Sequence, residues 1–167
     1  SRMAMCGSTL LTVYVDRADS AESVGTVVAY NAQSGDVLWQ KAYDDRVGGL
    51  ACNPDLNRVY VATNPFLFAF DAATGDEVWK YSSFGPVYNP SIANGVVYML
   101  SSTNMYALDE ATGQQLFFFR LGAEAEPTSQ VAISDGMVYF SGNGGTCDLY
   151  ALGLPEDSTA KGDSSGD

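Results

Sequence analysis

Short apolar stretches alternate with turn residues along this chain, and the alternation inside each stretch has the two-residue period of β-strands. Aliphatic and aromatic residues dominate four stretches, and small residues dominate three others that precede them. The first group comprises Leu11–Val15, Arg58–Thr63, Val96–Ser101 and Met137–Ser141, and the second comprises Gly48–Cys52, Pro90–Ala93 and Gln130–Ser134. Asn94-Gly95 and Asp135-Gly136 predict two-residue hairpin turns between paired stretches. The pattern therefore predicts an antiparallel all-β fold.

One phrase of the sequence recurs three times. Its copies are Ala29–Trp39, Ala69–Trp79 and Ala107–Phe117. Their glycines lie 40 and then 38 residues apart. A period of this length is typical of a repeat protein whose unit contains four strands.

The second copy shows what each position of the phrase does. Asp71 can accept hydrogen bonds from the backbone amides that follow it, and Thr74 can cap the same turn. Gly75 supplies a positive φ, so the chain reverses into a strand that carries Trp79. We expect this aromatic ring to fill the space between neighbouring units. The corresponding residues are Gly35 and Trp39 in the first copy, and Asp109, Thr112, Gly113 and Phe117 in the third.

Each unit is interpreted as a small-residue strand, a tyrosine-bearing strand, the strand that enters the phrase and the aromatic strand that leaves it. Such a unit is typical of a β-propeller blade, because blades converge on a channel and leave little room for the innermost strand. Residues 1–154 therefore predict about four blades, and the last is short of its closing strand. The expected blades are 3–43, 47–82, 87–121 and 129–154. Residues 155–167 are rich in Ser, Gly and Asp, and we expect an acidic, disordered tail.

The first unit is aligned with the second through its tyrosine and its cysteine. Cys6 and Tyr14 align with Cys52 and Tyr60 at a common offset of 46. This offset places the two cysteines at equivalent positions on neighbouring innermost strands. Small buried fillers are the favoured interpretation, and a disulfide is the less favoured one. Cys147 makes the set odd, and the three spacings are not those of a metal site.

The pattern Ala-x-Asp-x-x-Thr-Gly-x-x-x-Trp resembles the tryptophan-docking motif of the pyrroloquinoline-quinone-like (PQQ-like) repeat family. The second copy matches at every fixed position, the first has Asn31 and Ser34 as substitutions, and the third ends in Phe117. The resemblance covers roughly residues 3–154 and implies a propeller that usually has eight blades when closed. About four blades would be present here. We favour a piece of a longer propeller over a natural half-propeller that pairs with a second copy or another chain.

Acidic residues outnumber basic ones by 20 to 8, and histidine is absent. The resulting negative field repels nucleic acid and anionic membrane surfaces, so neither is an expected partner. Without histidine, the chain lacks the usual general base and the usual zinc ligand. No membrane span and no signal peptide are visible in the sequence, and the resemblance favours an exported protein, periplasmic or extracellular.

The resemblance implies three classes of function. A non-enzymatic scaffold that binds a protein partner is the favoured interpretation, with no catalytic, cofactor-binding or metal-binding residue assigned. A PQQ- and calcium-dependent alcohol or sugar dehydrogenase is the first alternative, although the adjacent cysteines expected of such enzymes are absent. A propeller that binds a sugar or another small ligand through Phe84 and Tyr88 is the second alternative.

The candidate partner face lies in the connections between blades. Arg46, Tyr88, Asn89 and Gln130 lie in or near these connections, and loops of this kind often carry binding residues. The Asp44-Asp45 pair lies in the first connection and is interpreted as a solvated loop. The sequence therefore predicts an interaction surface made by loops.

Overall fold

The computed structural model describes residues 2–16, 24–83, 85, 87–101, 104–121, 130–143 and 147–153. In this part of the chain, the strands form three four-stranded antiparallel sheets and one three-stranded sheet, each with its strands in chain order. The first sheet contains β1 (Arg2–Cys6), β2 (Thr9–Asp16), β3 (Val24–Asn31) and β4 (Val37–Tyr43), and the second contains β5 (Gly49–Asn53), β6 (Arg58–Ala62), β7 (Phe66–Asp71) and β8 (Glu77–Ser82). The third contains β9 (Ser91–Ala93), β10 (Val96–Ser101), β11 (Asn104–Asp109) and β12 (Gln115–Arg120), and the fourth contains β13 (Ala132–Ser134), β14 (Met137–Asn143) and β15 (Cys147–Gly153).

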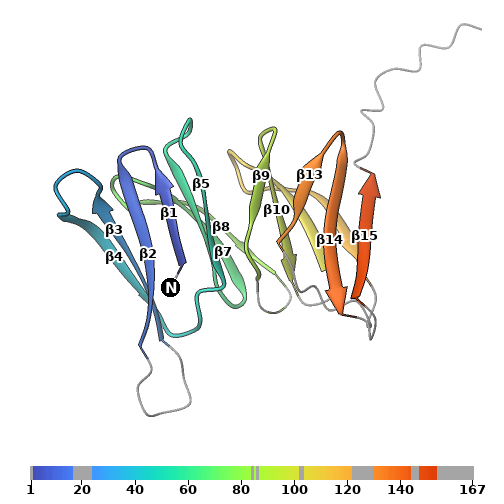
Figure 1. Ribbon diagram of the computed structural model, residues 1–167, viewed down its shortest axis with the longest axis horizontal. Helices are drawn as coiled ribbons and strands as arrows, with labels where there is room; N and C mark the ends of the chain where they lie inside the picture. Colours follow the sequence, from blue (N-terminus) through green and yellow to red (C-terminus); the bar gives the residue numbers. More distant parts are fainter. Residues whose placement is uncertain are drawn as a thin grey trace, which may run out of the picture.

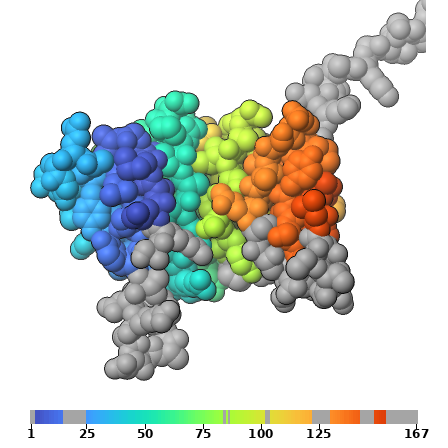
Figure 2. All heavy atoms as spheres, in the orientation of Figure 1, coloured from blue at the N-terminus to red at the C-terminus, as the bar shows by residue number. Residues whose placement is uncertain are grey.

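The four sheets stand side by side in chain order (Figure 1), and the space-filling view shows them as adjacent bands (Figure 2). The first and fourth sheets lie at opposite ends of the row, so the propeller is open. The predicted all-β partial propeller is confirmed. The expected tail, residues 155–167, lies outside the described residues.

The inner sheets bury both of their faces. In β6, Val59 and Val61 belong to the core between the first and second sheets, whereas Tyr60 and Ala62 belong to the core between the second and third. Strand β10 divides its side chains between the second and third cores in the same way. Since successive side chains point to opposite faces of a strand, these strands must be apolar at nearly every position.

Each tryptophan lies on a glycine of the next sheet. The Trp39 indole nitrogen donates a hydrogen bond of 2.9 Å to the carbonyl oxygen of Ala72. A Cβ atom on Gly75 would lie only 2.7 Å from the Trp39 ring. Trp79 lies on Gly113 in the same manner. The aromatic residue and the glycine of the repeated phrase therefore act together, each across a seam from its partner.

The turn before each glycine is closed by an acidic or amide side chain. One carboxylate oxygen of Asp71 accepts hydrogen bonds of 2.9 Å from the amides of Ala73 and Thr74. Asn31 makes the equivalent bonds in the first sheet with its amide oxygen. The bond from the Thr74 amide is the main reason that the pKa of Asp71 is lowered. The hydroxyl and amide of the residue three positions later likewise lower the pKa of Asp109.

The first sheet does not align with the second as the sequence predicted. Tyr60 pairs with Ala69 in the second sheet, and the residue that pairs with the equivalent Ala29 in the first sheet is Leu11. Leu11 therefore takes the place of Tyr60. Tyr14 lies further along β2, pairs with another residue and has 53% of its surface exposed. The shared offset was misleading because the turn between the first two strands is shorter in the first sheet.

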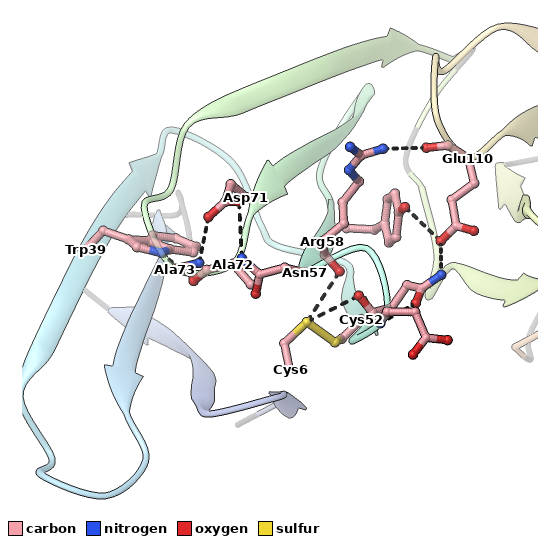
Figure 3. Close-up of a disulfide and its surroundings, with 12 residues drawn as sticks. Cys6, Trp39, Cys52, Asn57, Arg58, Asp71, Ala72, Ala73 and Glu110 are labelled. Atoms are coloured by element: carbon pink, nitrogen blue, oxygen red, sulfur yellow. Dashed lines mark hydrogen bonds between the residues drawn. A yellow bond between two sulfur atoms is a disulfide. The ribbon is translucent and has the colours of Figure 1, made fainter.

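This difference in register brings the two cysteines together. Cys6 is the last residue of β1 and pairs with Thr9, whereas Cys52 precedes the last residue of β5 and pairs with Val59. The two cysteines are therefore one position out of step within their sheets, so their side chains point to opposite faces. Because the sheets are neighbours, the two side chains meet across the seam. They form a disulfide with 5.5 Å between their Cα atoms (Figure 3). The favoured interpretation of two unlinked buried fillers is therefore wrong.

A buried carboxylate joins the second and third sheets close to this disulfide (Figure 3). Glu110 has 3% of its surface exposed, and one of its carboxylate oxygens accepts hydrogen bonds from Asn53 at 2.8 Å and from the Tyr60 hydroxyl at 2.9 Å. The Arg58 guanidinium donates to the Glu110 carbonyl oxygen at 3.0 Å. Burial raises the pKa of Tyr60, so its hydroxyl keeps its proton. The disulfide and this network together tie three sheets to one another.

Replacing single glycines by alanine should separate the two requirements at Gly75, which are a positive φ and room for the Trp39 ring. Gly35 and Gly75 have φ values of 77° and 75°, so Gly35→Ala and Gly75→Ala both incur about 1 kcal/mol for a left-handed residue. A Cβ on Gly35 meets nothing within 4 Å, whereas one on Gly75 meets the Trp39 ring. We expect Gly75→Ala to lower the free energy of unfolding by about 2 kcal/mol more than Gly35→Ala, measured by urea denaturation. Equal losses would contradict the role of the contact with tryptophan.

The turn carboxylates should make stability depend on pH. Because hydrogen bonds lower the folded-state pKa of Asp71 and Asp109 below the ordinary 3.8, their contribution is present above that value and is lost as the pH falls through the lowered pKa. Asn31 shows that an amide supports the same turn. We expect the double variant Asp71→Asn with Asp109→Asn to lose less stability than the parent between about pH 5 and about pH 3. Thermal denaturation across this range would measure it, and identical pH profiles would refute the assignment.

Candidate functional site

The connections between sheets come together at one end of the molecule. Antiparallel pairing places the β4–β5 connection, the β6–β7 loop and the β8–β9 connection on the same side. Backbone hydrogen bonds join these segments, from Gly48 to Ala62 at 2.6 Å and from Val87 to Thr63 at 3.2 Å. We call this side the connection end. Two cavities open there between the first and second sheets and the start of the third.

The first cavity, here called the loop cavity, has a volume of about 270 Å³. All three segments contribute to it, and apolar surface predominates in its lining. Its lining residues are Asp45, Arg46, Gly48, Thr63, Asn64, Val87 and Tyr88.

The second cavity, here called the aromatic cavity, has a volume of about 280 Å³. It lies where β4 ends and β7 begins, and three aromatic side chains and two carboxylates contribute to its lining. The lining residues are Ala42, Tyr43, Asp44, Asp45, Thr63, Asn64, Phe66 and Phe68. Asp45, Thr63 and Asn64 line both cavities, so the two adjoin.

Tyr43 packs across the seam at the aromatic cavity. Its ring centroid lies 5.6 Å from that of Phe68, and its hydroxyl oxygen is buried without a hydrogen-bond partner. Burial, and to a smaller extent the negative charge of Glu77, raises the pKa of this hydroxyl. A buried hydroxyl with no partner is uncommon, because its desolvation is not compensated.

Close packing at the connection end depends on two glycines. A Cβ atom on Gly48 would overlap the carbonyl oxygen of Val87, and one on Gly49 would overlap the side chain of Asn89. The chain at Gly48 and Gly49 therefore lies too close to the β8–β9 connection to leave room for a Cβ atom. Glycine is required here for the close approach and not for a positive φ.

The structure brings together three of the four residues predicted for the partner face. Arg46 and Tyr88 line the loop cavity, and Asn89 packs beside it over Gly49. Gln130 is exposed in the next connection and lines neither cavity. Phe84, predicted for sugar binding, lies outside the described residues. Whether any of these residues contacts a partner stays a prediction.

Sequence analysis missed the aromatic cavity. Tyr43 was not singled out, and Phe66 and Phe68 lie in the next sheet, so no local pattern connects them. The available signal was the position of Asp44 and Asp45 directly after an aromatic strand residue. Both residues lie in the β4–β5 connection, with Asp44 exposed as expected of a solvated loop, and both also line the cavity.

Both tryptophans of the chain are engaged in seams. The rings of Trp39 and Trp79 are packed on glycines of neighbouring sheets, so neither is free to lie against a planar quinone. Across the described ranges, no group of three or more acidic, cysteine or histidine side chains converges on a metal position. No catalytic step is derived for this site.

Blades of this kind, joined by aromatic–glycine seams, define a repeat propeller. The chain belongs to the PQQ-like propeller family whose model, described as "Outer membrane protein assembly factor BamB", matches residues 23–152. Among curated proteins, no significant match was found.

Solved structures share the fold at low sequence identity. A computationally designed protein, Ika4, aligns over 92% of this chain and 90% of its own with a TM-score of 0.77 and 14% identity. BamB from Moraxella catarrhalis aligns over 91% of this chain and 54% of its own, with a TM-score of 0.63 and 18% identity. A europium-containing methanol dehydrogenase aligns over 86% and 35%, with a TM-score of 0.66 and 14% identity. The chain thus spans about half the length of BamB, and these likenesses show the fold alone.

Gly48→Ala should disturb the connection end directly. The added methyl group would force the β4–β5 connection away from the Val87 carbonyl, and we expect a loss of about 1 to 3 kcal/mol in the free energy of unfolding. Gly95→Ala, where a Cβ meets nothing within 4 Å, provides a control far from this contact. Amide chemical shifts in the two connections should change only in the first variant. Unchanged shifts there would contradict the close approach.

Proposed function

We propose that this chain is a non-enzymatic part of a PQQ-like propeller and acts as a rigid scaffold for protein interaction. The connection end is the proposed binding surface. The observation that carries the proposal is the pair of adjoining cavities formed there by three connecting segments. Binding surfaces of propellers and other repeat folds are commonly built from loops on a stable framework.

The stability of the framework supports a scaffold role. A disulfide joins the first two sheets, and the Glu110 carboxylate joins the second and third. Such ties hold loops from different blades in fixed relative positions, and preorganised loops bind with a smaller loss of conformational entropy. A protein partner follows as the expected ligand, in line with the assembly-factor description of the matching family.

The tryptophans favour this proposal over a dehydrogenase, because both rings are engaged in seams. We also propose an exported location, because disulfides persist in oxidising compartments. In the described part of the chain, no helix is long and apolar enough to cross a membrane.

The free faces of the end sheets are the second place where another blade could pack. Met3 and Met5 on the first sheet have 68% and 55% of their surfaces exposed, and Leu149 on the fourth has 74%. Apolar side chains on an uncovered sheet face are a liability in water. Pairing with a second half-propeller, from a second copy or another chain, remains a prediction.

Site-specific photocrosslinking should test the binding surface. A benzoylphenylalanine at Tyr88, 36% exposed at the loop cavity, should form adducts with a partner protein in extract of the source organism. Leu56 is 46% exposed in the β5–β6 turn at the opposite end, and the same probe there is the matched control. We expect adducts from position 88 and few from position 56. Equal labelling from both positions, or none from position 88, would refute the connection end as the interaction surface.

A further inference from the structure

The aromatic cavity has a composition suited to one kind of side chain. Tyr43, Phe66 and Phe68 supply aromatic rings to its lining, and Asp44 and Asp45 supply carboxylates. Its volume of about 280 Å³ is just below the range of ligand pockets, so it suits a side chain better than a large cofactor.

Cations already lie against the aromatic rings of this seam. The Lys80 ammonium lies 4.8 Å from the centroid of Phe66 and 5.8 Å from that of Phe68. Phe66 and Phe68 lie two residues apart on β7, and their ring centroids are 5.7 Å apart. The negative face of such rings attracts cations, and the attraction increases when water is excluded.

The two carboxylates add hydrogen-bond acceptors beside the rings. Asp44 and Asp45 both line the cavity, whereas the Tyr43 hydroxyl oxygen is buried and out of reach of a ligand. A ligand that carries several N–H donors could bind both carboxylates at the same time. The chain's net charge of −12 attracts a positively charged partner over a longer range.

We propose that the aromatic cavity binds the guanidinium group of an arginine side chain presented by a partner protein. The proposal rests on the proposed scaffold function and names the chemistry of the partner. Guanidinium is planar, stacks on aromatic rings and has five donors, whereas the ammonium of lysine is compact and strongly hydrated. Arginine therefore uses the rings and the carboxylates together, and lysine uses chiefly the charge.

Blocked tripeptides provide the test with the whole chain. Acetyl-Gly-Arg-Gly-amide is titrated against the ¹⁵N-labelled protein, and the lysine and citrulline peptides serve as matched probes. We expect the arginine peptide to shift the amides of Asp44, Asp45 and Asn64, and to bind at least about fivefold more tightly than either other peptide. Citrulline has nearly the shape of arginine without its charge. Equal affinity for all three peptides, or shifts confined to other residues, would overturn the proposal.

Two variants separate binding from folding. Tyr43→Phe removes only a hydroxyl that is buried without a partner, so neither the melting temperature nor the arginine-peptide affinity should fall, and this variant is the control. Asp44→Asn removes one charge from an exposed position and should weaken binding about threefold. Unchanged affinity in Asp44→Asn would overturn the assignment of this carboxylate.

Failure of arginine recognition can be distinguished from failure of the proposed scaffold function. Adducts from position 88 together with no arginine-dependent shifts would retain the scaffold and reject arginine recognition. Arginine-dependent shifts that need a higher peptide concentration in Asp44→Asn than in Tyr43→Phe would support the arginine site independently of any adduct.

Discussion

The first two seams between blades depend on the contact of an indole ring with a glycine. Trp39 lies on Gly75, and Trp79 lies on Gly113. The glycine meets two requirements at once, because the turn needs a positive φ and the ring leaves no room for a Cβ atom. The indole hydrogen bond to the neighbouring carbonyl then fixes the direction of approach. The second blade thus carries the glycine of one seam and the tryptophan of the next, so one short phrase serves both faces of its sheet.

The alternation of side chains along each strand decides which of the two neighbouring cores a side chain enters. Because both faces of an inner sheet are buried, a change of one position sends a side chain into a different core. The cysteines illustrate the consequence. Had Cys6 and Cys52 been equivalent, both would have pointed in the same direction along the row, and no bond could have formed between neighbours. Their opposite parity permits the disulfide, and Glu110 provides a polar tie across the following seam.

Function in this architecture is a property of the connecting loops, since the seams are common to proteins with different activities. At the connection end, Gly48 packs closely against the backbone of Val87, whereas the other loop residues differ from repeat to repeat. Arg46 and Tyr88 could be selected from the sequence because they lie in connections. The aromatic cavity could not, because Tyr43 and Phe68 come from different sheets and meet only when the blades stack. A local pattern does not report which end of one strand lies beside which end of another.

The sequence by itself determined the class of fold, the strand order within a blade and the turns. Each of these depends on local physics: the two-residue period, the positive φ of Gly75, and the hydrogen bonds of Asp71 to the amides that follow it. Only the tertiary structure decided the register between blades, and with it the equivalence of Leu11 to Tyr60 and the pairing of Cys6 with Cys52. Register follows from turn lengths and from packing between sheets, and residues far apart in the sequence determine both.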